Sequence, residues 1–170
     1  MLTRLPRAGH SVSVRVRYYE TDAMGVVHHS NYIRWFEVAR TDYLRAAGLP
    51  YRDLEESGTI SPVIGVRCNY LQSARYDDAL DIRAWVSAYN GVRLTISYEV
   101  TRDGVVLCTG ESDHAFLHGG RPVAPKRSLP HVHQVLSACL SRASALASPE
   151  INSASPDTQS APTQAGSGRN

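Results

Sequence analysis

The chain has 170 residues, which is enough for one domain with its own hydrophobic core but short for two. Hydrophobic residues make up 42% of the chain and charged residues 20%, as in ordinary soluble globular proteins. The net charge is only +2 and the basic residues are scattered, which argues against nucleic acid as a partner.

Nothing in the chain indicates a membrane segment or an oxidising compartment. No window approaches the ~18 consecutive apolar residues expected of a membrane-spanning helix. The first residues, MLTRLPRAGH, lack the apolar stretch of a signal peptide. Cys68, Cys108 and Cys139 lie far apart without a CxxC pair, which predicts reduced and mostly buried thiols. We therefore expect a cytoplasmic protein without a membrane span.

The first predicted element is a strand. Residues Ser11–Tyr19 read SVSVRVRYY and alternate between apolar and polar side chains. The side chains that share the apolar face are Val12, Val14, Val16 and Tyr18. This period of two predicts a half-buried strand with its apolar face toward the core.

A long helix is predicted next, over Asn31–Ala47 (NYIRWFEVARTDYLRAA). Its apolar residues recur at steps of three and four, which is the period of an α-helix. We expect Ser30 or Asn31 to cap its amino end, and Gly48 followed by Pro50 to end it. Because the apolar surface extends well beyond a single stripe, we expect the rest of the fold to wrap around this helix.

Four strand-like segments follow the helix. They are Ile60–Gln72, which Pro62 interrupts, then Leu80–Tyr89, Val92–Thr101 and Val105–Leu117. The pairs Asn90-Gly91 and Asp103-Gly104 predict tight hairpins between the later segments. The order of strand, helix and four strands predicts an α+β fold, in which an antiparallel β-sheet wraps around one long central α-helix.

The last part of the chain changes composition. A shorter helix is predicted over His131–Leu146, after Pro130. Residues 148–170 are rich in Ser, Ala, Pro, Gln and Gly and contain almost no large apolar residues. Such a segment cannot bury enough surface to fold, so we expect a disordered tail. The folded domain is therefore expected over residues 8–147.

The segment Tyr18–Tyr32, YYETDAMGVVHHSNY, carries the candidate site. Asp22 lies in a polar turn before Gly25, and the predicted helix begins shortly after His29. A carboxylate opposite the amino end of a helix can attack a carbonyl, or activate water against it, while the helix end polarises the carbonyl. A thioester suits this arrangement because its leaving thiol, with a pKa of about 8.5, needs little help from an acid. Taken alone, Asp22 would more often be a turn or capping residue.

The run ETDAMGVVHHSNYIRWFEVART, residues 20–41, resembles the signature of the 4-hydroxybenzoyl-CoA thioesterase family of hotdog-fold proteins. It is most similar to the bacterial acyl-CoA thioesterase branch that is often linked to the Tol-Pal system. The predicted order of elements is also the hotdog order. The resemblance extends over about residues 12–128 and is concentrated in residues 14–48. It is specific for the fold and the branch but not for the substrate.

The resemblance implies a thioester hydrolase that acts on short- or medium-chain or aromatic acyl-CoA. No cofactor is expected, because coenzyme A is part of the substrate. Asp22 would be the base or nucleophile, and His29 would lie at the helix end that polarises the carbonyl. The residues predicted to contact the substrate are Gly25, Val26, His28 and Tyr32. His28 stands where an aromatic such as Tyr is more usual, so we expect it to influence the acyl preference.

The resemblance also implies a homodimer or homotetramer, with active sites at the subunit interface. Two other functions stay open on the sequence. One is hydrolysis of acyl-acyl carrier protein, and the other is a non-catalytic hotdog module that binds acyl thioesters. An intact Asp22 argues against the second, because a pure binding module does not need a carboxylate beside the thioester.

Other polar residues receive structural interpretations. Glu37 lies three residues before Arg40 on the predicted helix, which favours an ion pair over catalysis. His114 and His118 are four apart on a predicted strand, which separates them by about 13 Å. No carboxylate or cysteine is spaced to join the histidines, so no metal site is expected. The GxSxG, GxGxxG and P-loop patterns are absent.

Overall fold

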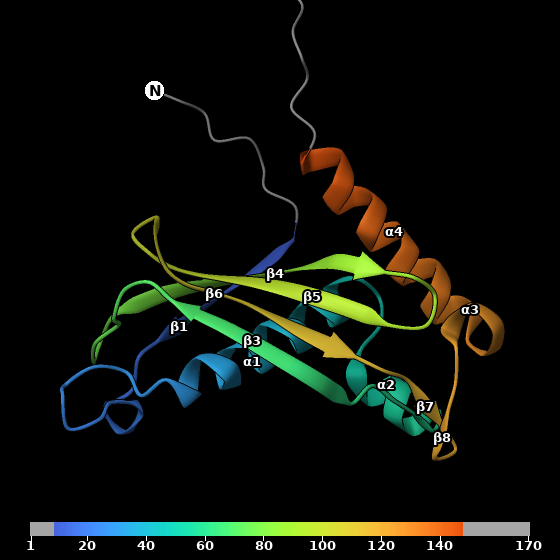
Figure 1. Ribbon diagram of the computed structural model, residues 1–170, viewed down its shortest axis with the longest axis horizontal. Helices are drawn as coiled ribbons and strands as arrows, with labels where there is room; N and C mark the ends of the chain where they lie inside the picture. Colours follow the sequence, from blue (N-terminus) through green and yellow to red (C-terminus); the bar gives the residue numbers. More distant parts are fainter. Residues whose placement is uncertain (1–8, 148–170) are drawn as a thin grey trace, which may run out of the picture.

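The computed structural model describes residues 9–147, in which an antiparallel sheet packs against one long helix (Figure 1). Five strands lie in the order β1-β4-β5-β6-β3. Their bounds are His10–Arg15 (β1), Val63–Tyr70 (β3), Ala79–Tyr89 (β4), Leu94–Arg102 (β5) and Val105–His114 (β6). This arrangement confirms the predicted α+β class and the hotdog fold. Residue 8 of the predicted domain and the predicted tail over 148–170 lie outside the described residues.

The remaining elements are shorter, apart from two helices. Strands β2 (Thr59–Ile60), β7 (Leu117–His118) and β8 (Arg121–Pro122) form a small second sheet. The helices are η1 (a 3-10 turn, Tyr18–Glu20), α1 (Ser30–Ala46), α2 (Tyr51–Glu56), α3 (Pro125–Ser128) and α4 (Pro130–Ala147). No helix within residues 9–147 is long and apolar enough to cross a membrane.

The two predicted hairpins join β4 to β5 and β5 to β6. In the first turn, Asn90 Oδ1 accepts hydrogen bonds from the backbone N–H groups of Val92 and Arg93, at 2.9 and 2.8 Å. In the second turn, Asp103 and Gly104 both have positive φ, as a two-residue turn of this hand requires. Short-range turn chemistry therefore specified these connections correctly.

Strand β3 takes a position that its place in the sequence does not indicate. It pairs with β6, which comes last of the five strands along the chain, rather than with β4, which follows β3 directly. The connection over residues 71–78 leads from β3 at one edge of the sheet to β4, which lies next to the opposite edge strand β1 (Figure 1). As a result, β3 is an edge strand and its end lies beside the amino end of α1.

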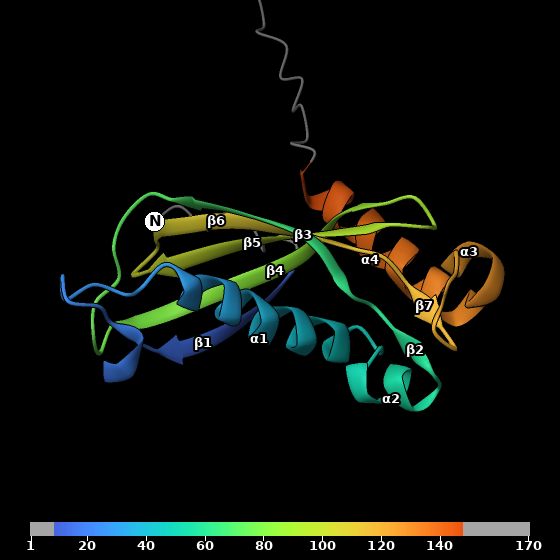
Figure 2. The ribbon, with the colours of Figure 1, turned by 60° about the horizontal axis from the view of Figure 1, so that its bottom comes forward.

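Helix α1 lies along one face of the sheet (Figure 2). The ring of Phe36 stacks on that of Tyr98, with ring centroids 4.4 Å apart. A Cβ atom at Gly110 would clash with the Phe36 ring, so glycine at this position lets the helix approach the sheet closely. Burial of these side chains and of β4 residues 80, 82, 84 and 86 forms the core between helix and sheet.

Three local predictions were wrong. Strand β1 ends at Arg15, and Tyr18 lies in η1 with 78% of its surface exposed, because the chain turns away from the sheet after Val16. Neither Ser30 nor Asn31 caps α1; both lie in its first turn, and His29 occupies the capping position without a side-chain cap. The Asn31 amide instead donates to the Glu20 carbonyl oxygen at 2.7 Å.

The prediction that the sheet wraps around the long helix α1 is confirmed. On the side of the helix away from the sheet, Ile33 and Val38 are 41% and 48% exposed. The predicted carboxyl-terminal helix is confirmed as α4, which packs against β4. The three cysteines are free thiols, and two of them are buried, as predicted.

Candidate active site

A cavity of about 250 Å³ lies between the loop that holds Asp22, the start of α1 and the end of β3. Four of the six predicted site residues line it, namely Asp22, Val26, His29 and Tyr32. The other lining residues are Met24, Val27, Tyr70, Leu71, Gln72 and Ser73. The cavity therefore joins the predicted motif to the residues that follow β3, which the sequence reasoning had not selected.

The Asp22 loop is held in a tight turn. The Asp22 N–H donates to the Val26 carbonyl oxygen, and the Gly25 N–H donates to the Asp22 carbonyl oxygen, both at 2.9 Å. Gly25 has a φ of +72°, which glycine adopts without strain. One carboxylate oxygen of Asp22, Oδ1, accepts a hydrogen bond from the Met24 N–H at 2.8 Å. None of the described residues donates to the other oxygen, Oδ2, so Asp22 combines a turn role with an open acceptor.

Glu20 fastens this loop to α1. Its side chain is 5% exposed, and its two carboxylate oxygens accept hydrogen bonds from the Trp35 indole N–H at 3.0 Å and from the Arg17 backbone N–H at 2.7 Å. Its carbonyl oxygen accepts from the Asn31 amide at 2.7 Å and from the His28 N–H at 2.9 Å. Glu20 thereby sets the position of the Asp22 loop relative to the start of the helix.

The sequence reasoning did not select Glu20. An acidic residue two positions before Asp22 has no periodic signal and is more often solvated. Only the packing of η1 against Trp35 shows that this carboxylate is buried and paired.

His29 stands at the amino end of α1, as predicted. Its carbonyl oxygen accepts a hydrogen bond from the Tyr70 hydroxyl at 3.1 Å. No described residue accepts a hydrogen bond from its backbone N–H, so this donor is available at the positive end of the helix dipole. The His29 ring is exposed and lies against the His28 ring, with centroids 4.1 Å apart.

Gly25 and His28 do not line the cavity of a single chain. The exposed His28 ring has its Nδ1 2.9 Å from the Ser30 Oγ. Contact of either residue with substrate stays a prediction, as does the influence of His28 on acyl preference.

Two tyrosines form a wall of the cavity. The Tyr32 and Tyr70 rings meet edge to face with centroids 5.3 Å apart, and the Tyr32 hydroxyl accepts a hydrogen bond from the Ala74 N–H at 3.2 Å. Burial raises the pKa of both phenols, and for Tyr70 the neighbouring Cys68 thiol adds to this shift. Both tyrosines are therefore neutral at physiological pH and act as polar, uncharged walls.

The other candidates from the sequence have structural surroundings. Glu37 Oε1 is 2.6 Å from Arg40 Nη2, which confirms the predicted ion pair, and the Glu37 side chain is 52% exposed whereas that of Arg40 is 4% exposed. Beneath the middle of α1, Arg40, Tyr98, Ser112 and His114 form a buried polar cluster. In it the Ser112 Oγ lies 2.6 Å from the Tyr98 Oη and 2.7 Å from the His114 Nε2.

Burial lowers the pKa of His114 to about 4, and the positive charge of Arg40 acts in the same direction. His114 is therefore neutral at physiological pH. Within residues 9–147, no group of three or more His, Cys, Asp or Glu side chains is arranged to hold a metal ion.

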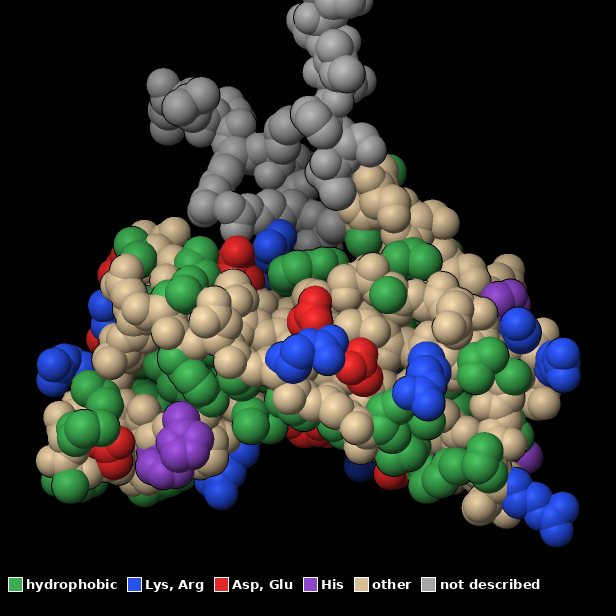
Figure 3. All heavy atoms as spheres, viewed as in Figure 1, with side chains coloured by type: hydrophobic (Ala, Val, Ile, Leu, Met, Phe, Trp, Pro, Cys, Tyr) green, Lys and Arg blue, Asp and Glu red, His purple; other side chains and the backbone are tan. Residues whose placement is uncertain are grey.

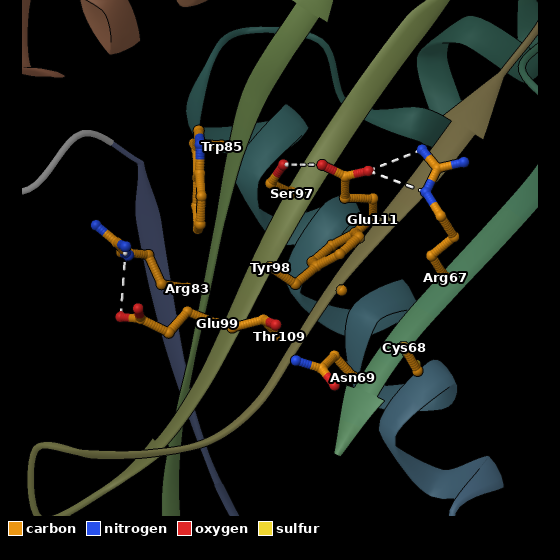
Figure 4. A pocket seen from close by; sticks show the side chains of 11 residues that line it. Arg67, Cys68, Asn69, Arg83, Trp85, Ser97, Tyr98, Glu99, Thr109 and Glu111 are labelled. Carbon is orange, nitrogen blue, oxygen red and sulfur yellow. Dashed lines mark hydrogen bonds and ion pairs between the residues drawn. The ribbon is translucent and has the colours of Figure 1, made fainter. Parts of the chain in front are cut away.

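A larger cavity, of about 500 Å³, lies on the face of the sheet away from α1 (Figure 4). Its charged side chains form two ion pairs, Arg67–Glu111 at 2.7 Å and Arg83–Glu99 at 3.4 Å. The Arg83 guanidinium also lies 4.4 Å from the ring centroid of Trp85. Because these acids and bases already neutralise one another, the smaller cavity beside Asp22 is the better candidate for chemistry.

Comparison with known proteins identifies the family of the chain. The sequence model of the thioesterase-like superfamily matches residues 16–143. An acyl-CoA thioesterase of Haemophilus influenzae, YbgC, is 35% identical over 100 residues, which are 58% of this chain and 74% of that protein.

Two solved structures are similarly related. A hypothetical protein of Thermus thermophilus, TT1821, superposes with a TM-score of 0.72 at 35% identity, over 76% of this chain and 98% of that one. A DHNA-CoA thioesterase of Staphylococcus aureus has the same TM-score and identity, over 75% of this chain and 88% of that one.

Proposed function

Because this chain belongs to the thioesterase-like superfamily, we propose that it hydrolyses acyl-CoA in the cavity beside Asp22. The chain is a thioester hydrolase; the proposal concerns its substrate, its catalytic residues and its assembly. The observation that carries it is the open Oδ2 of Asp22 in the same cavity as the amino end of α1.

The substrate class is short- or medium-chain or aromatic acyl-CoA. Support comes from the Haemophilus influenzae relative, which is named an acyl-CoA thioesterase, and from the Staphylococcus aureus neighbour, named a DHNA-CoA thioesterase. Assignment to the branch linked to the Tol-Pal system, and a cytoplasmic location, stay predictions from the sequence.

In the proposed reaction, the Asp22 carboxylate acts as general base or as nucleophile. As a base, it takes a proton from water, whose oxygen adds to the thioester carbonyl. As a nucleophile, it adds to the carbonyl itself and forms an anhydride that water then opens. By either route the C–S bond breaks, the electron pair leaves with sulfur, and the products are a carboxylic acid and a thiol.

The developing negative charge on the carbonyl oxygen needs a donor in place before the reaction. The free N–H of His29 and the dipole of α1 supply it at the cavity wall. The hydrogen bond from Tyr70 to the His29 carbonyl oxygen holds the next peptide group, between His29 and Ser30, and so restrains the His29 backbone.

We propose that two chains assemble through β3, as a homodimer or as half of a homotetramer. Strand β3 is the edge of the sheet, and its exposed apolar side chains include Val63, Ile64, Val66 and Tyr70. A long apolar edge strand with unpaired backbone groups favours pairing with another strand, and a second β3 offers the same surface. Because Tyr70 also lines the cavity, such a pair would place the site at the interface. A monomer mass in light scattering would contradict this assembly.

Replacement of Asp22 by Asn tests the catalytic assignment. We expect Asp22→Asn to lower the turnover number for acyl-CoA by about a hundredfold or more, because the amide is neither base nor nucleophile. The mass and the melting temperature should not change, since Asn preserves the turn.

Asp103→Asn is the matched control. Asp103 lies in the β5–β6 turn with a φ of +50°, which Asn also adopts readily, so this variant should keep wild-type turnover. Wild-type turnover in Asp22→Asn would contradict the proposed mechanism.

A further inference from the structure

The loop over residues 71–78 lies beside the Asp22 loop at one end of the molecule (Figures 1 and 2). The Val27 N–H donates to the Ala74 carbonyl oxygen at 2.8 Å, and the Tyr32 hydroxyl accepts from the Ala74 N–H. Ala74 is fully buried by these contacts. The next residue, Arg75, is exposed, and its Nη1 lies 4.0 Å from the position that a Cβ on Gly25 would take. The Arg75 guanidinium group therefore lies next to the turn that holds Asp22.

The Arg75 guanidinium has no ion-pair partner among residues 9–147. The nearby carboxylates are engaged elsewhere: Asp78 pairs with Arg102 at 2.6 Å, and Asp77 pairs with Arg15 at 3.3 Å. An exposed cation that its surroundings leave unneutralised, next to the turn that holds Asp22, is suited to an anionic part of the substrate.

Exposed aromatic rings lie in the same part of the molecule. The Tyr18 and Tyr76 rings meet edge to face with centroids 5.6 Å apart, and both are largely exposed. They line a third cavity, of about 610 Å³, together with Arg17 and the buried Trp35 and Glu20. At this end of the molecule, Figure 3 shows basic, acidic, histidine and apolar side chains close together. Aromatic faces next to arginines suit a purine base attached to phosphates.

We propose that Arg75, with the Tyr18–Tyr76 ring pair beside it, binds the phosphorylated adenine nucleotide of coenzyme A. This inference rests on the proposed function and deepens it, because it selects the carrier of the acyl group. Acyl-CoA carries an adenine nucleotide with several phosphate charges, whereas an acyl carrier protein presents only a phosphopantetheine arm. The phosphopantetheine arm also carries a phosphate but has no adenine ring, so Arg75 together with the exposed Tyr18–Tyr76 ring pair favours acyl-CoA over the carrier protein.

The test compares two substrates that share one acyl group, acyl-CoA and acyl-pantetheine, which lacks the nucleotide and its phosphates. For Arg75→Gln, we expect the KM for acyl-CoA to rise about tenfold with turnover within about twofold, through loss of a charge-assisted hydrogen bond. The KM for acyl-pantetheine should not change. Arg121→Gln, an exposed arginine on β8 at the other end of the molecule, is the matched control and should alter neither value.

Calorimetry with free coenzyme A provides a second readout that does not need turnover. We expect binding to Arg75→Gln to be about tenfold weaker than to the wild type, and the difference to shrink at high salt. Equal KM changes for both substrates, or unchanged coenzyme A affinity in Arg75→Gln, would overturn the inference. Arg75-dependent coenzyme A binding without any turnover would instead support the inference and contradict the proposed function.

Discussion

Helix α1 brings a histidine and a carboxylate together at two places, and the two places differ in their surroundings. At its amino end, Asp22 and His29 line a cavity, and each keeps one hydrogen-bonding group without a partner among the described residues. Beneath its middle, His114 is buried beside Ser112 and Arg40, and Glu37 neutralises Arg40.

The difference shows what makes a reactive site in this protein. Both places contain residue types that are common in catalysis, so residue type does not distinguish them. A reacting molecule needs access and an unsatisfied donor or acceptor, and only the amino end of α1 provides both. In the buried polar cluster, His114 Nδ1 and Arg40 Nε also have no hydrogen-bond partner among the described residues, but both side chains are buried and out of reach of a substrate. Changes there should therefore affect stability rather than turnover.

The largest expected effect concerns the stability of the buried polar cluster. Because the pKa of His114 falls from 6.5 to about 4 on folding, the unfolded chain binds a proton between these values that the folded chain does not. Stability contributed by neutral His114 is therefore present above pH 6.5 and lost as the pH falls toward 4, by about 3 kcal/mol in all. Urea unfolding of the wild type and His114→Gln at several pH values measures this loss.

The loss should be smaller in His114→Gln, which has no proton to gain at this position. An NMR titration of the wild-type His114 ring checks the same pKa without any substitution. A pH dependence of unfolding that is equal in both proteins would show that the buried polar cluster does not behave as described.

The next effect concerns Glu20, which we treat as a positioning residue for Asp22. In Glu20→Gln the amide N–H would face one of the two N–H donors, from Arg17 or Trp35, and the loop would shift. We expect the turnover number to fall about tenfold with KM within about twofold.

Trp35→Phe removes the indole N–H donor, so the amide oxygen that Glu20→Gln introduces can accept the hydrogen bond from the Arg17 N–H. The double variant Glu20→Gln with Trp35→Phe should therefore recover part of the turnover number lost in Glu20→Gln. Failure of this rescue, or equal changes in kcat and KM with a lowered melting temperature, would argue for a purely structural role.

The smallest effect concerns Glu37, the carboxylate beside the buried polar cluster. Glu37→Gln should leave turnover within about twofold, because this side chain does not line the cavity. Its cost in stability should stay below about 1 kcal/mol, since the pair is half exposed on the Glu37 side. Steady-state kinetics and urea unfolding measure both. If Glu37→Gln lost as much turnover as we expect for Asp22→Asn, the buried polar cluster could no longer be called structural and the amino end of α1 catalytic.

Much of the fold followed from local patterns. The strand-like segments, the turns at Asn90-Gly91 and Asp103-Gly104, and the helical period of α1 each depend on interactions between near neighbours in sequence. The exposure of Tyr18 and the capping of α1 were predicted wrongly, because packing of η1 against Trp35 decides them.

The residues of the candidate site also fall into two groups, those predicted from the sequence and those that only the tertiary structure brings to it. Asp22, Val26, His29 and Tyr32 form one short segment, and a family signature covers it, so the sequence alone brings these residues together. Tyr70 and Arg75 join them only because β3 pairs with β6 and its outgoing loop returns over Gly25.

By itself, the sequence determined the Asp22 turn and the helix that follows it, since each is set by side chains within a few residues of one another. Its resemblance to a known family implied the hotdog class. The tertiary structure decided which end of the sheet meets that helix and which acid is buried. It also decided which arginine beside the Asp22 turn has no ion-pair partner within residues 9–147. These outcomes depend on contacts between distant segments, whose burial and charge balance no local pattern encodes.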